Sequence, residues 1–228
     1  MERKIIITGD GSGSISIPGM NVTYHSIHGA IRESKHVFIE AGLKSVRPLA
    51  AARRIGIFEM GFGTGLNALL TLTEAEKLNR KVHYETIELF PLNNEMIRSL
   101  NYCEQLERSD LQTVFEKLHT CDWEKEITIT PNFLFKKSRT NLLNFETPRT
   151  SGTFELIYFD AFDPNVQPEL WTKEIFDKMF SLLQPGGLLV TYSSKGDVRR
   201  AMQSAGFNVE KLPGPLFKRE ITKASKSG

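Results

Sequence analysis

Three glycines at alternate positions, Gly61, Gly63 and Gly65, are the feature that most constrains this chain. They follow a short apolar run over residues 55–58 and precede a segment, from Leu66 onward, whose apolar spacing is typical of a helix. The pattern predicts a strand, a glycine loop and a helix. Glycines let the backbone turn tightly and approach a ligand closely, and the start of a helix offers free N–H groups. We therefore expect a nucleotide-like ligand on this loop.

The loop fits neither of the common phosphate-binding motifs. Its third glycine comes one residue too early for the dinucleotide pattern G-x-G-x-x-G, and no Gly-Lys-Ser/Thr of a P-loop follows. Glu59, at the end of the predicted strand, would repel a pyrophosphate but suits a cationic ligand. Among common cofactors this favours S-adenosylmethionine, which carries an ammonium and a sulfonium charge. The alternative at this point is a glycine-rich turn of an α/β protein that binds no ligand.

A second acid follows the next predicted strand. Residues 81–87 have the composition of a strand and end at Glu88, which lies 23 residues after Gly65. In nucleoside-binding α/β sheets, an acid at this place accepts hydrogen bonds from both ribose hydroxyls. We therefore expect Glu88 to bind a ribose, and the alternative is a solvated loop acid.

A third acid, Asp160, ends the apolar run over residues 154–159. Predicted strands alternate with predicted helices along most of the chain, which indicates a doubly wound, mostly parallel α/β sheet. Ligands bind such sheets at the carboxyl ends of the strands, where all three acids fall. One acid for a cationic amino-acid moiety, one for a ribose and one facing the reaction are typical of the Rossmann-like fold of S-adenosylmethionine-dependent methyltransferases.

The two ends of the chain depart from this alternation. Residues 4–8 and 14–17 flank a glycine-rich turn and predict a small N-terminal hairpin, and the last segments predict an antiparallel C-terminal strand. We expect an N-terminal extension over residues 1–48 that packs on the core. A methyltransferase domain is expected over residues 49–228, with a helical insertion near residues 101–126.

Composition argues against several classes of function. The 29 basic and 27 acidic side chains leave a net charge of +2, so any surface for nucleic acid must be local. The two cysteines, Cys103 and Cys121, have neither metal-ligand nor disulfide spacing. His25, His28 and His36 fit no zinc pattern, so we expect them to line a cleft or the surface, and no metal is expected. No apolar run has the length of a membrane span and no secretory signal is recognised, so we expect a cytoplasmic protein.

Short motifs spread over most of the chain resemble the methyltransferase component of the MnmC enzymes, which also occurs as a stand-alone protein called MnmD. The motifs lie at residues 37–39, 59–67, 84–92, 160–164, 168–172, 185–187, 191–194, 198–200, 205–207 and 218–220. Each motif is short, but their order and spacing are specific. The resemblance implies methyl transfer from S-adenosylmethionine to the amine of 5-aminomethyl-2-thiouridine at the tRNA wobble position, giving 5-methylaminomethyl-2-thiouridine. We expect no counterpart here of the flavin-dependent oxidase half of the bifunctional enzymes.

The expected site residues follow from this chemistry. Asp160 is expected to orient the attacking amine and accept or relay its proton, because the amine must be uncharged when it attacks. Phe162, Pro164 and Tyr192 are expected to line the substrate pocket. The residues expected to bind the cofactor are Glu59, Gly61, Gly63, Thr64, Gly65, Asn67, Glu88 and Asp160. A bulky side chain at Gly63 or Gly65 is expected to occupy the space of the ligand.

Two further expectations concern the adenine and the RNA. Where relatives tend to carry Gly-Asp after the third strand, this chain has Ser138 and Arg139, so an acid that would contact the adenine is missing. A base extruded from the tRNA anticodon loop stacks on aromatic side chains, and local cations bind its phosphates. The cations expected to do so are Arg199, Arg200, Lys218 and Arg219, and the alternative for each pair is ordinary solvated charge.

Two other functions stay open at this point. A small-molecule amine methyltransferase, or a spermidine-synthase-like enzyme that transfers an aminopropyl group, would keep the fold and use an acidic pocket. An RNA-binding module without catalysis would keep the fold but not the cofactor. Binding of S-adenosylmethionine and methylation of tRNA distinguish the three.

Overall fold

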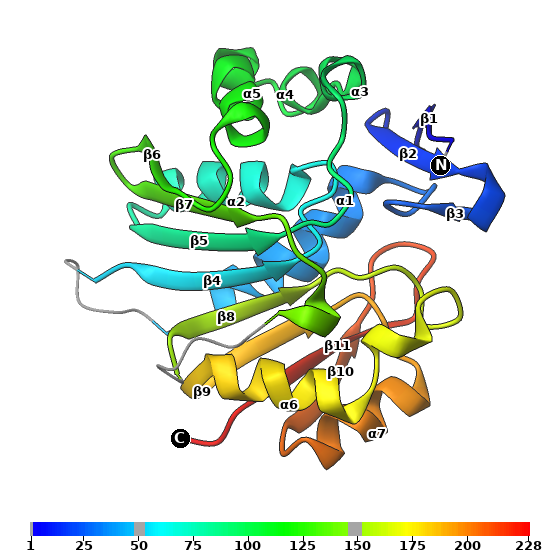
Figure 1. Cartoon of the computed structure of the whole chain (residues 1–228), viewed down its shortest axis with the longest axis vertical. Coiled ribbons are helices and arrows are strands. Elements are labelled where there is room, and N and C mark those ends of the chain that lie inside the picture. The colour runs from blue at the N-terminus through cyan, green and yellow to red at the C-terminus, as the bar shows by residue number, and fades with distance from the viewer. Residues whose placement is uncertain (1, 48–52, 146–151) are drawn as a thin grey trace.

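The computed structural model describes residues 2–47, 53–145 and 152–228, in which the chain forms two sheets (Figure 1). The larger sheet has eight strands in the order β10-β11-β9-β8-β4-β5-β7-β6. In chain order these are β4 (Ile55–Met60), β5 (Val82–Ile87), β6 (Glu126–Thr130), β7 (Phe133–Ser138), β8 (Phe154–Phe159), β9 (Leu183–Thr191), β10 (Asn208–Pro213) and β11 (Glu220–Ser225). The domain boundary expected at residue 48 lies outside the described residues.

The large sheet is parallel in its centre and antiparallel at its edges. β7, β5, β4, β8 and β9 run parallel to one another, whereas β6 at one edge and β11 and β10 at the other run antiparallel to their neighbours. The mostly parallel α/β sheet with an antiparallel C-terminal end is therefore confirmed. Because β4, β5 and β8 run side by side in one direction, their carboxyl ends meet at one edge.

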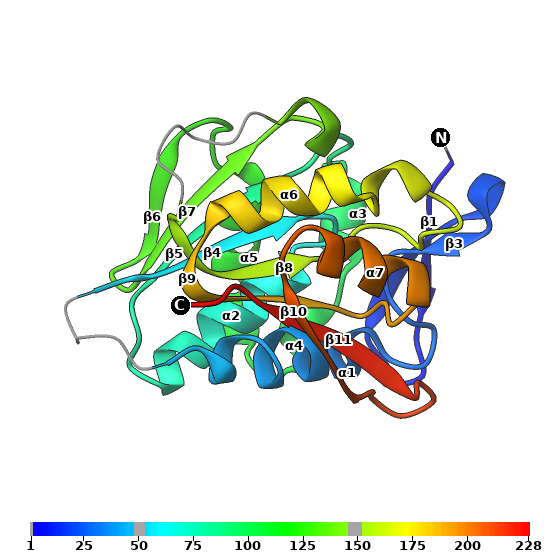
Figure 2. The same cartoon turned by 90° about the horizontal axis from the view of Figure 1, so that it is seen from below.

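Helices cover both faces of this sheet, and alternate residues of each strand belong to opposite faces (Figure 2). Ile57 packs in the core on one face and Phe58 in the core on the other. The helices of the first face are α1 (Ala30–Ser34), α2 (Leu66–Lys77), α3 (Asn94–Ser99), α4 (Tyr102–Gln105) and α5 (Gln112–Thr120). Those of the second face are α6 (Lys173–Leu182) and α7 (Gly196–Ser204).

Polar side chains cap the first turns of α3 and α6. Asn93 Oδ1 accepts a hydrogen bond of 2.9 Å from the N–H of Met96 at the start of α3, and Thr172 caps α6. α3 thus begins three residues after Pro91, at Asn94. The segment expected as a helical insertion holds α4 and α5 with a 3₁₀ turn between them.

The smaller sheet is N-terminal and lies beside the edge toward which β4, β5 and β8 run (Figure 1). It comprises β1 (Lys4–Ile7), β2 (Gly13–Ile17) and β3 (Val22–Thr23), all antiparallel. The expected hairpin is present, and the short third strand was not expected. After it the chain forms α1, a π-helical stretch (Lys35–Glu40) and a 3₁₀ turn (Leu43–Ser45), which pack on the same core as α2. No helix in the described residues combines the length and hydropathy that crossing a bilayer requires.

Candidate active site

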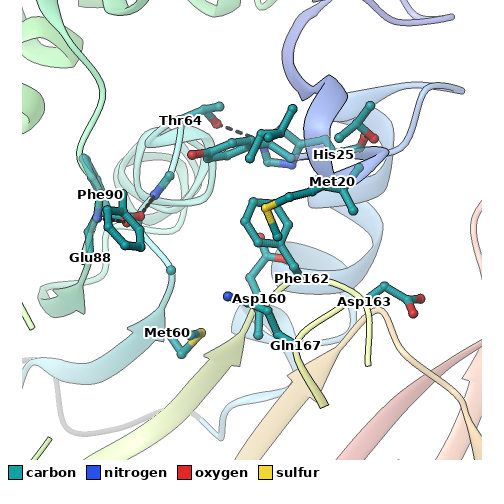
Figure 3. Close-up of a pocket in the computed structure, with 18 of the residues that line it drawn as sticks. Met20, His25, Met60, Thr64, Glu88, Phe90, Asp160, Phe162, Asp163 and Gln167 are labelled. Atoms are coloured by element: carbon teal, nitrogen blue, oxygen red, sulfur yellow. Dashed lines mark hydrogen bonds between the residues drawn. The ribbon is translucent and has the colours of Figure 1, made fainter. Parts of the chain in front are cut away.

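A cavity of about 690 Å³ lies beyond the carboxyl ends of β4, β5 and β8, and we call it the pocket. The main sheet and its loops form one side, and the N-terminal segment between Ser16 and Ile27 forms the other (Figure 3). Its volume is that of an ordinary small-molecule site. Glu88 and Asp160 line different walls, so the fold brings residues from distant parts of the chain around one cavity.

The glycine loop turns sharply at the end of β4. Gly61, Gly63 and Gly65 have φ angles of 90°, 49° and 73°, a region of backbone conformation that favours glycine. The N–H of Gly61 donates to Ile87 O at 3.2 Å. A Cβ atom at Gly61 would lie 2.8 Å from the backbone oxygen of Asp160. The loop is therefore held between the ends of β5 and β8 with no room for a side chain at its first glycine.

Gly65 does not line the pocket, which corrects the expectation that a side chain there would occupy the space of the ligand. A Cβ atom at Gly65 would lie 2.8 Å from His119 Nε2 and 3.1 Å from the Phe62 ring. A substitution would therefore disturb the packing behind the loop. Gly65 precedes α2, and its left-handed conformation lets the chain enter the helix.

Glu88 follows β5 and faces the pocket from the wall beside the glycine loop (Figure 3). Its Oε2 accepts a hydrogen bond of 2.9 Å from Gly63 N, and its Oε1 accepts one of 2.8 Å from Phe90 N. Each carboxylate oxygen has a second lone pair. Glu88 therefore fixes the loop and can still accept hydrogen bonds from a vicinal diol.

Asp160 follows β8 and lines the pocket beside α2. Its Oδ2 accepts a hydrogen bond of 2.9 Å from Asn67 Nδ2. Burial raises the pKa of Asp160 to about 7; the Asn67 hydrogen bond and the charge of Lys218 oppose this rise, and Glu33 adds to it. A carboxyl group with a pKa near neutrality is suited to exchange a proton with a substrate.

Glu59, expected to contact a cationic cofactor, lies behind the pocket wall in this structure. Its side chain is fully buried, and it is absent from the lining of the pocket. Oε2 accepts a hydrogen bond of 2.9 Å from Thr86 Oγ1. Its side-chain neighbours are Thr86 on β5 and Asn67 on α2, which separate its carboxyl group from the cavity.

Two of the three residues expected to line the substrate pocket do so. Phe162 lines the pocket and packs edge-on against Tyr24, with ring centroids 5.2 Å apart. Tyr192 also lines the pocket, but its hydroxyl donates to Ala161 O at 2.8 Å and so fixes the chain after β8. Pro164 is not among the lining residues.

Of the four cations expected to bind RNA, one lines the pocket and three do not. Lys218, in the connection between β10 and β11, lines the pocket. It forms an ion pair of 2.9 Å with Glu33 and lies over the Tyr192 ring, 4.4 Å from the centroid. Arg199, Arg200 and Arg219 do not line the pocket, and Arg200 pairs with Asp197 within α7. Only Lys218 is therefore in a position to contact a ligand inside the pocket.

Sequence reasoning did not identify Tyr24 and His25 as site residues, although it expected His25 to line a cleft or the surface. His25 lines the pocket, and its Nε2 shares a hydrogen bond of 2.7 Å with Thr64 Oγ1 (Figure 3). Burial lowers the pKa of His25 to about 4, so the ring is neutral at physiological pH. Met20 and Gln167, also on the wall, carried no recognisable signal in the sequence.

The wall after β7 lies where an adenine would be expected. Ser138 and Arg139 do not line the pocket, and Thr140, Asn141 and Leu142 do. Asn141 Oδ1 accepts a hydrogen bond of 3.0 Å from Leu143 N, which holds this turn. The missing acid is thus replaced on the wall by a hydroxyl, an amide and an apolar side chain.

The charge of the lining suits a cationic ligand such as S-adenosylmethionine. The acids on the wall are Glu33, Glu88, Asp160, Asp163 and Glu169, and the lysine and arginine side chains are Arg3 and Lys218. An excess of acids suits a cationic ligand. The glycine loop allows a close approach to the backbone, and Glu88 can accept hydrogen bonds from a ribose. In the described part of the chain, no group of His, Cys, Asp and Glu is arranged to hold a metal ion.

Comparisons with known proteins agree with this geometry. The bifunctional protein MnmC of tRNA 5-methylaminomethyl-2-thiouridine biosynthesis from Pseudomonas fluorescens is 29% identical over 204 residues, which cover 87% of this chain and 31% of that protein. Its counterpart from Chromobacterium violaceum is 29% identical over 207 residues, with the same two coverages. The chain therefore spans about a third of the length of these relatives.

Solved structures extend the comparison to the fold. MNMC2 from Aquifex aeolicus has a TM-score of 0.76 and 25% identity, and the match covers 100% of this chain and 71% of that one. Spermidine synthase from Thermotoga maritima has a TM-score of 0.58 at 13% identity, covering 99% and 69%, and shares the fold. A family model described as S-adenosyl-L-methionine-dependent methyltransferase matches residues 100–227. The chain belongs to this S-adenosyl-L-methionine-dependent methyltransferase family, and its resemblance to the MnmC enzymes is confirmed.

Proposed function

We propose that this protein transfers a methyl group from S-adenosylmethionine to the amine of 5-aminomethyl-2-thiouridine at the wobble position of tRNA. The product is 5-methylaminomethyl-2-thiouridine. The observation that carries the proposal is Asp160, a carboxylate on the pocket wall, fixed by Asn67 and located next to the glycine loop. The MnmC relatives, which are named for tRNA 5-methylaminomethyl-2-thiouridine biosynthesis, support the choice of substrate.

In this proposal the chain's own residues position the two reactants. S-adenosylmethionine supplies an activated methyl group when bound. The glycine loop and Glu88 hold the cofactor, and Thr64 and Asn67 lie beside them on the wall. Asp160 accepts a hydrogen bond from the amine, aligns it for in-line attack and takes or relays its proton. The raised pKa of Asp160, about 7, matches it to an amine that must lose a proton near neutral pH.

The nucleobase would enter between the N-terminal segment and the loop after β8. Phe162 and Tyr24 present aromatic surfaces there, and a splayed RNA base stacks on such surfaces. Phe90, 60% exposed at the mouth, offers a further surface. Lys218 and Arg3 are the lysine and arginine side chains on the pocket wall, and Arg199, Arg200 and Arg219 would contact the tRNA outside the pocket.

The test is mass spectrometry of wobble-uridine nucleosides after incubation of the protein and S-adenosylmethionine with under-modified tRNA. We expect one added methyl group on 5-aminomethyl-2-thiouridine. tRNA that carries an unmodified wobble uridine is the matched control and should gain no methyl group. Cofactor binding without methylation of either tRNA would contradict the proposal.

A small-molecule amine is the second candidate substrate. The excess of acids on the pocket wall favours it, because an acidic pocket also attracts a polyamine. Spermidine and putrescine, incubated with the protein and labelled S-adenosylmethionine, distinguish the two candidates. Label transferred to a polyamine and not to tRNA would replace the first proposal with this one.

Glu88→Ala is expected to weaken the binding of S-adenosylmethionine by a few kcal/mol at most, roughly one bidentate charge-assisted interaction. Glu88→Gln should lose less, since the amide oxygen can still accept from Gly63 N or Phe90 N. Isothermal titration calorimetry measures both. The exposed Glu95 on α3 provides the control, and Glu95→Ala should bind as wild type does. If Glu88→Ala also bound with unchanged affinity, Glu88 would not be the ribose ligand.

A further inference from the structure

A second, smaller cavity of about 120 Å³ adjoins the pocket and is not used in the mechanism above; we call it the side cleft. Two segments form it, residues 26–33, in which α1 begins, and residues 215–218 in the connection between β10 and β11. Ser26, Glu33 and Lys218 line both cavities, so the pocket and the side cleft share one wall. The side cleft is smaller than the usual site for a whole small molecule, which suits it to one flat group of a larger ligand.

The side cleft carries large apolar side chains that are exposed to solvent. Phe217 is 72% exposed and its neighbour Leu216 is 63% exposed. The Phe217 ring lies against the imidazole of His28, with the ring centroids 4.5 Å apart and the planes inclined at 33°. His28 is exposed as well. Exposed apolar side chains that gather in one place indicate a surface that binds another molecule.

The backbone at Phe217 is strained. The N–H of Lys218 donates to Pro215 O at 2.9 Å and closes a four-residue turn in which Phe217 is the third residue. The φ angle of Phe217 is 71°, and a turn position with such an angle is ordinarily occupied by glycine or asparagine. Because its ring is mostly exposed, Phe217 recovers little of this cost by burial. Strain of this kind points to a role in binding and not in stability.

The charges of the side cleft suit an anionic ligand. Lys218 and Arg32 are its lysine and arginine residues, and Glu33 is its acid. The Arg32 guanidinium donates to a backbone oxygen and, among the described residues, pairs with no acid. Asp10 accepts a hydrogen bond from the backbone N–H of Arg32 but does not line the side cleft. The lining therefore has one more positive than negative charge.

Lys218 lies at the boundary between the two cavities. Its ammonium group has three donors, and Glu33 Oε1 accepts one of them at 2.9 Å. The same ammonium lies over the Tyr192 ring, 4.4 Å from the centroid. The other donors are left for an anionic group that passes from the pocket into the side cleft.

We propose that the side cleft stacks the nucleobase adjacent to the one that enters the pocket, with the phosphate between the two nucleotides bound by Lys218. Phe217, backed by His28, is the stacking surface, because aromatic side chains stack unpaired bases and cations bind the phosphates. An apolar protein partner would leave the charges of Lys218 and Arg32 unmatched. The inference rests on the proposed function for the identity of the RNA, and it adds that two successive nucleotides are recognised.

Fluorescence anisotropy of a labelled anticodon stem-loop RNA, titrated with the protein and S-adenosylhomocysteine, tests the stacking surface. Phe217→Ala should weaken RNA binding about 5- to 150-fold, which corresponds to about 1–3 kcal/mol for stacking one base on an aromatic side chain. The matched control is Leu78→Ala. Leu78 is also exposed, at 40%, but it follows the far end of α2 and lines neither cavity, so RNA should bind this variant as it binds wild type.

RNA with an abasic nucleotide identifies the base that Phe217 contacts. The base is removed on the 5′ side of the wobble nucleotide in one RNA and on the 3′ side in another. One of these RNAs should bind wild type as weakly as the intact RNA binds Phe217→Ala, and it should lose nothing further with Phe217→Ala, because both changes remove the same contact. Full additivity of the two losses for both RNAs would overturn the inference.

Phe217→Gly and Phe217→Tyr separate binding from a structural role. Glycine adopts a φ of 71° without strain, so the melting temperature of Phe217→Gly should not fall, whereas its RNA affinity should fall as in Phe217→Ala. Tyrosine also stacks on a base, so Phe217→Tyr should keep the affinity of wild type. A lower melting temperature of Phe217→Gly with unchanged RNA affinity would make Phe217 a structural residue and would contradict the proposal.

The kinetics of methylation distinguish a failure of this inference from a failure of the proposed function. Phe217→Ala should raise KM for the RNA with little change in kcat, because the side cleft lies beside the pocket and holds no reacting atom. Methylation of tRNA by Phe217→Ala with the KM of wild type would refute the side cleft alone. If wild type methylated no tRNA, the proposed function would fail, and the binding of intact and abasic RNA would still decide whether Phe217 stacks a base.

Discussion

Replacing Asp160 with alanine is expected to lower kcat about a hundredfold to ten-thousandfold, the usual contribution of a general base. Cofactor binding should persist, since the glycine loop and Glu88 remain in place. The reason is the position of the carboxylate on the pocket wall, where Asn67 fixes it at 2.9 Å and burial raises its pKa to about 7. Single-turnover methylation of tRNA and calorimetry with S-adenosylmethionine measure the two effects separately.

Asp160→Asn separates positioning from proton transfer. An amide can still accept a hydrogen bond from the amine through its oxygen, but it cannot take the proton. Asp163→Asn is the control on the same loop. Asp163 forms an exposed ion pair of 2.6 Å with Lys195, so its loss should cost at most about fivefold, or about 1 kcal/mol. Near-wild-type turnover of Asp160→Asn would reduce Asp160 to positioning, and the same result for Asp160→Ala would remove it from the mechanism.

Replacing Gly63 with valine is expected to abolish measurable binding of S-adenosylmethionine in a protein that still folds. At a φ of 49°, valine is strained, and its Cβ would lie 3.0 Å from the Tyr24 ring on the pocket wall. The N–H of Gly63 also donates to Glu88, so a displaced loop would move the expected ribose ligand. Calorimetry measures the loss of binding, and circular dichroism checks the fold.

Gly186→Val is the matched control for backbone strain. Gly186 has a φ of 79°, but a Cβ there would have no atom within 4 Å, and the residue is exposed and does not line the pocket. This variant should lose stability without losing cofactor affinity. Gly65→Val should act on stability too, through its contacts with His119 and Phe62. Equal cofactor affinity in Gly63→Val and wild type would refute the assignment of the loop.

Local patterns in the sequence were enough to predict the central part of the fold. The apolar runs before Glu59 and Asp160 belong to β4 and β8, because a strand buried on both faces needs near-continuous apolar residues. The segment before Glu88, in which apolar and polar residues alternate, forms β5. Parallel strands place their carboxyl ends at one edge, so the meeting of Glu88 and Asp160 at one pocket follows from strand order. The helix after the glycine loop begins at Leu66, as its apolar spacing predicted.

The boundaries of irregular elements were less predictable. A Pro-Gly-Gly sequence such as residues 185–187 is typical of a turn, yet here it lies inside β9, which begins at Leu183. The pairing of β8 with β9 shifts register there, between Phe154 and Leu156, and so accommodates the glycines. Similarly, the segment before α6 first forms a 3₁₀ turn over Pro168–Leu170, and α6 starts only at Lys173, behind the Thr172 cap.

The sequence by itself determined the fold class, the glycine loop and the acids at the strand ends, because each depends on a few neighbouring residues and on strand polarity. Only the tertiary structure decided which of these residues reach the pocket. Glu59 and Gly65 were covered by α2, β5 and the ring of His119, whereas Lys218, His25 and Tyr24 came to the pocket wall from distant segments. The physical reason is that burial and long-range contacts depend on how separate elements pack, and the local pattern of residues does not contain that information.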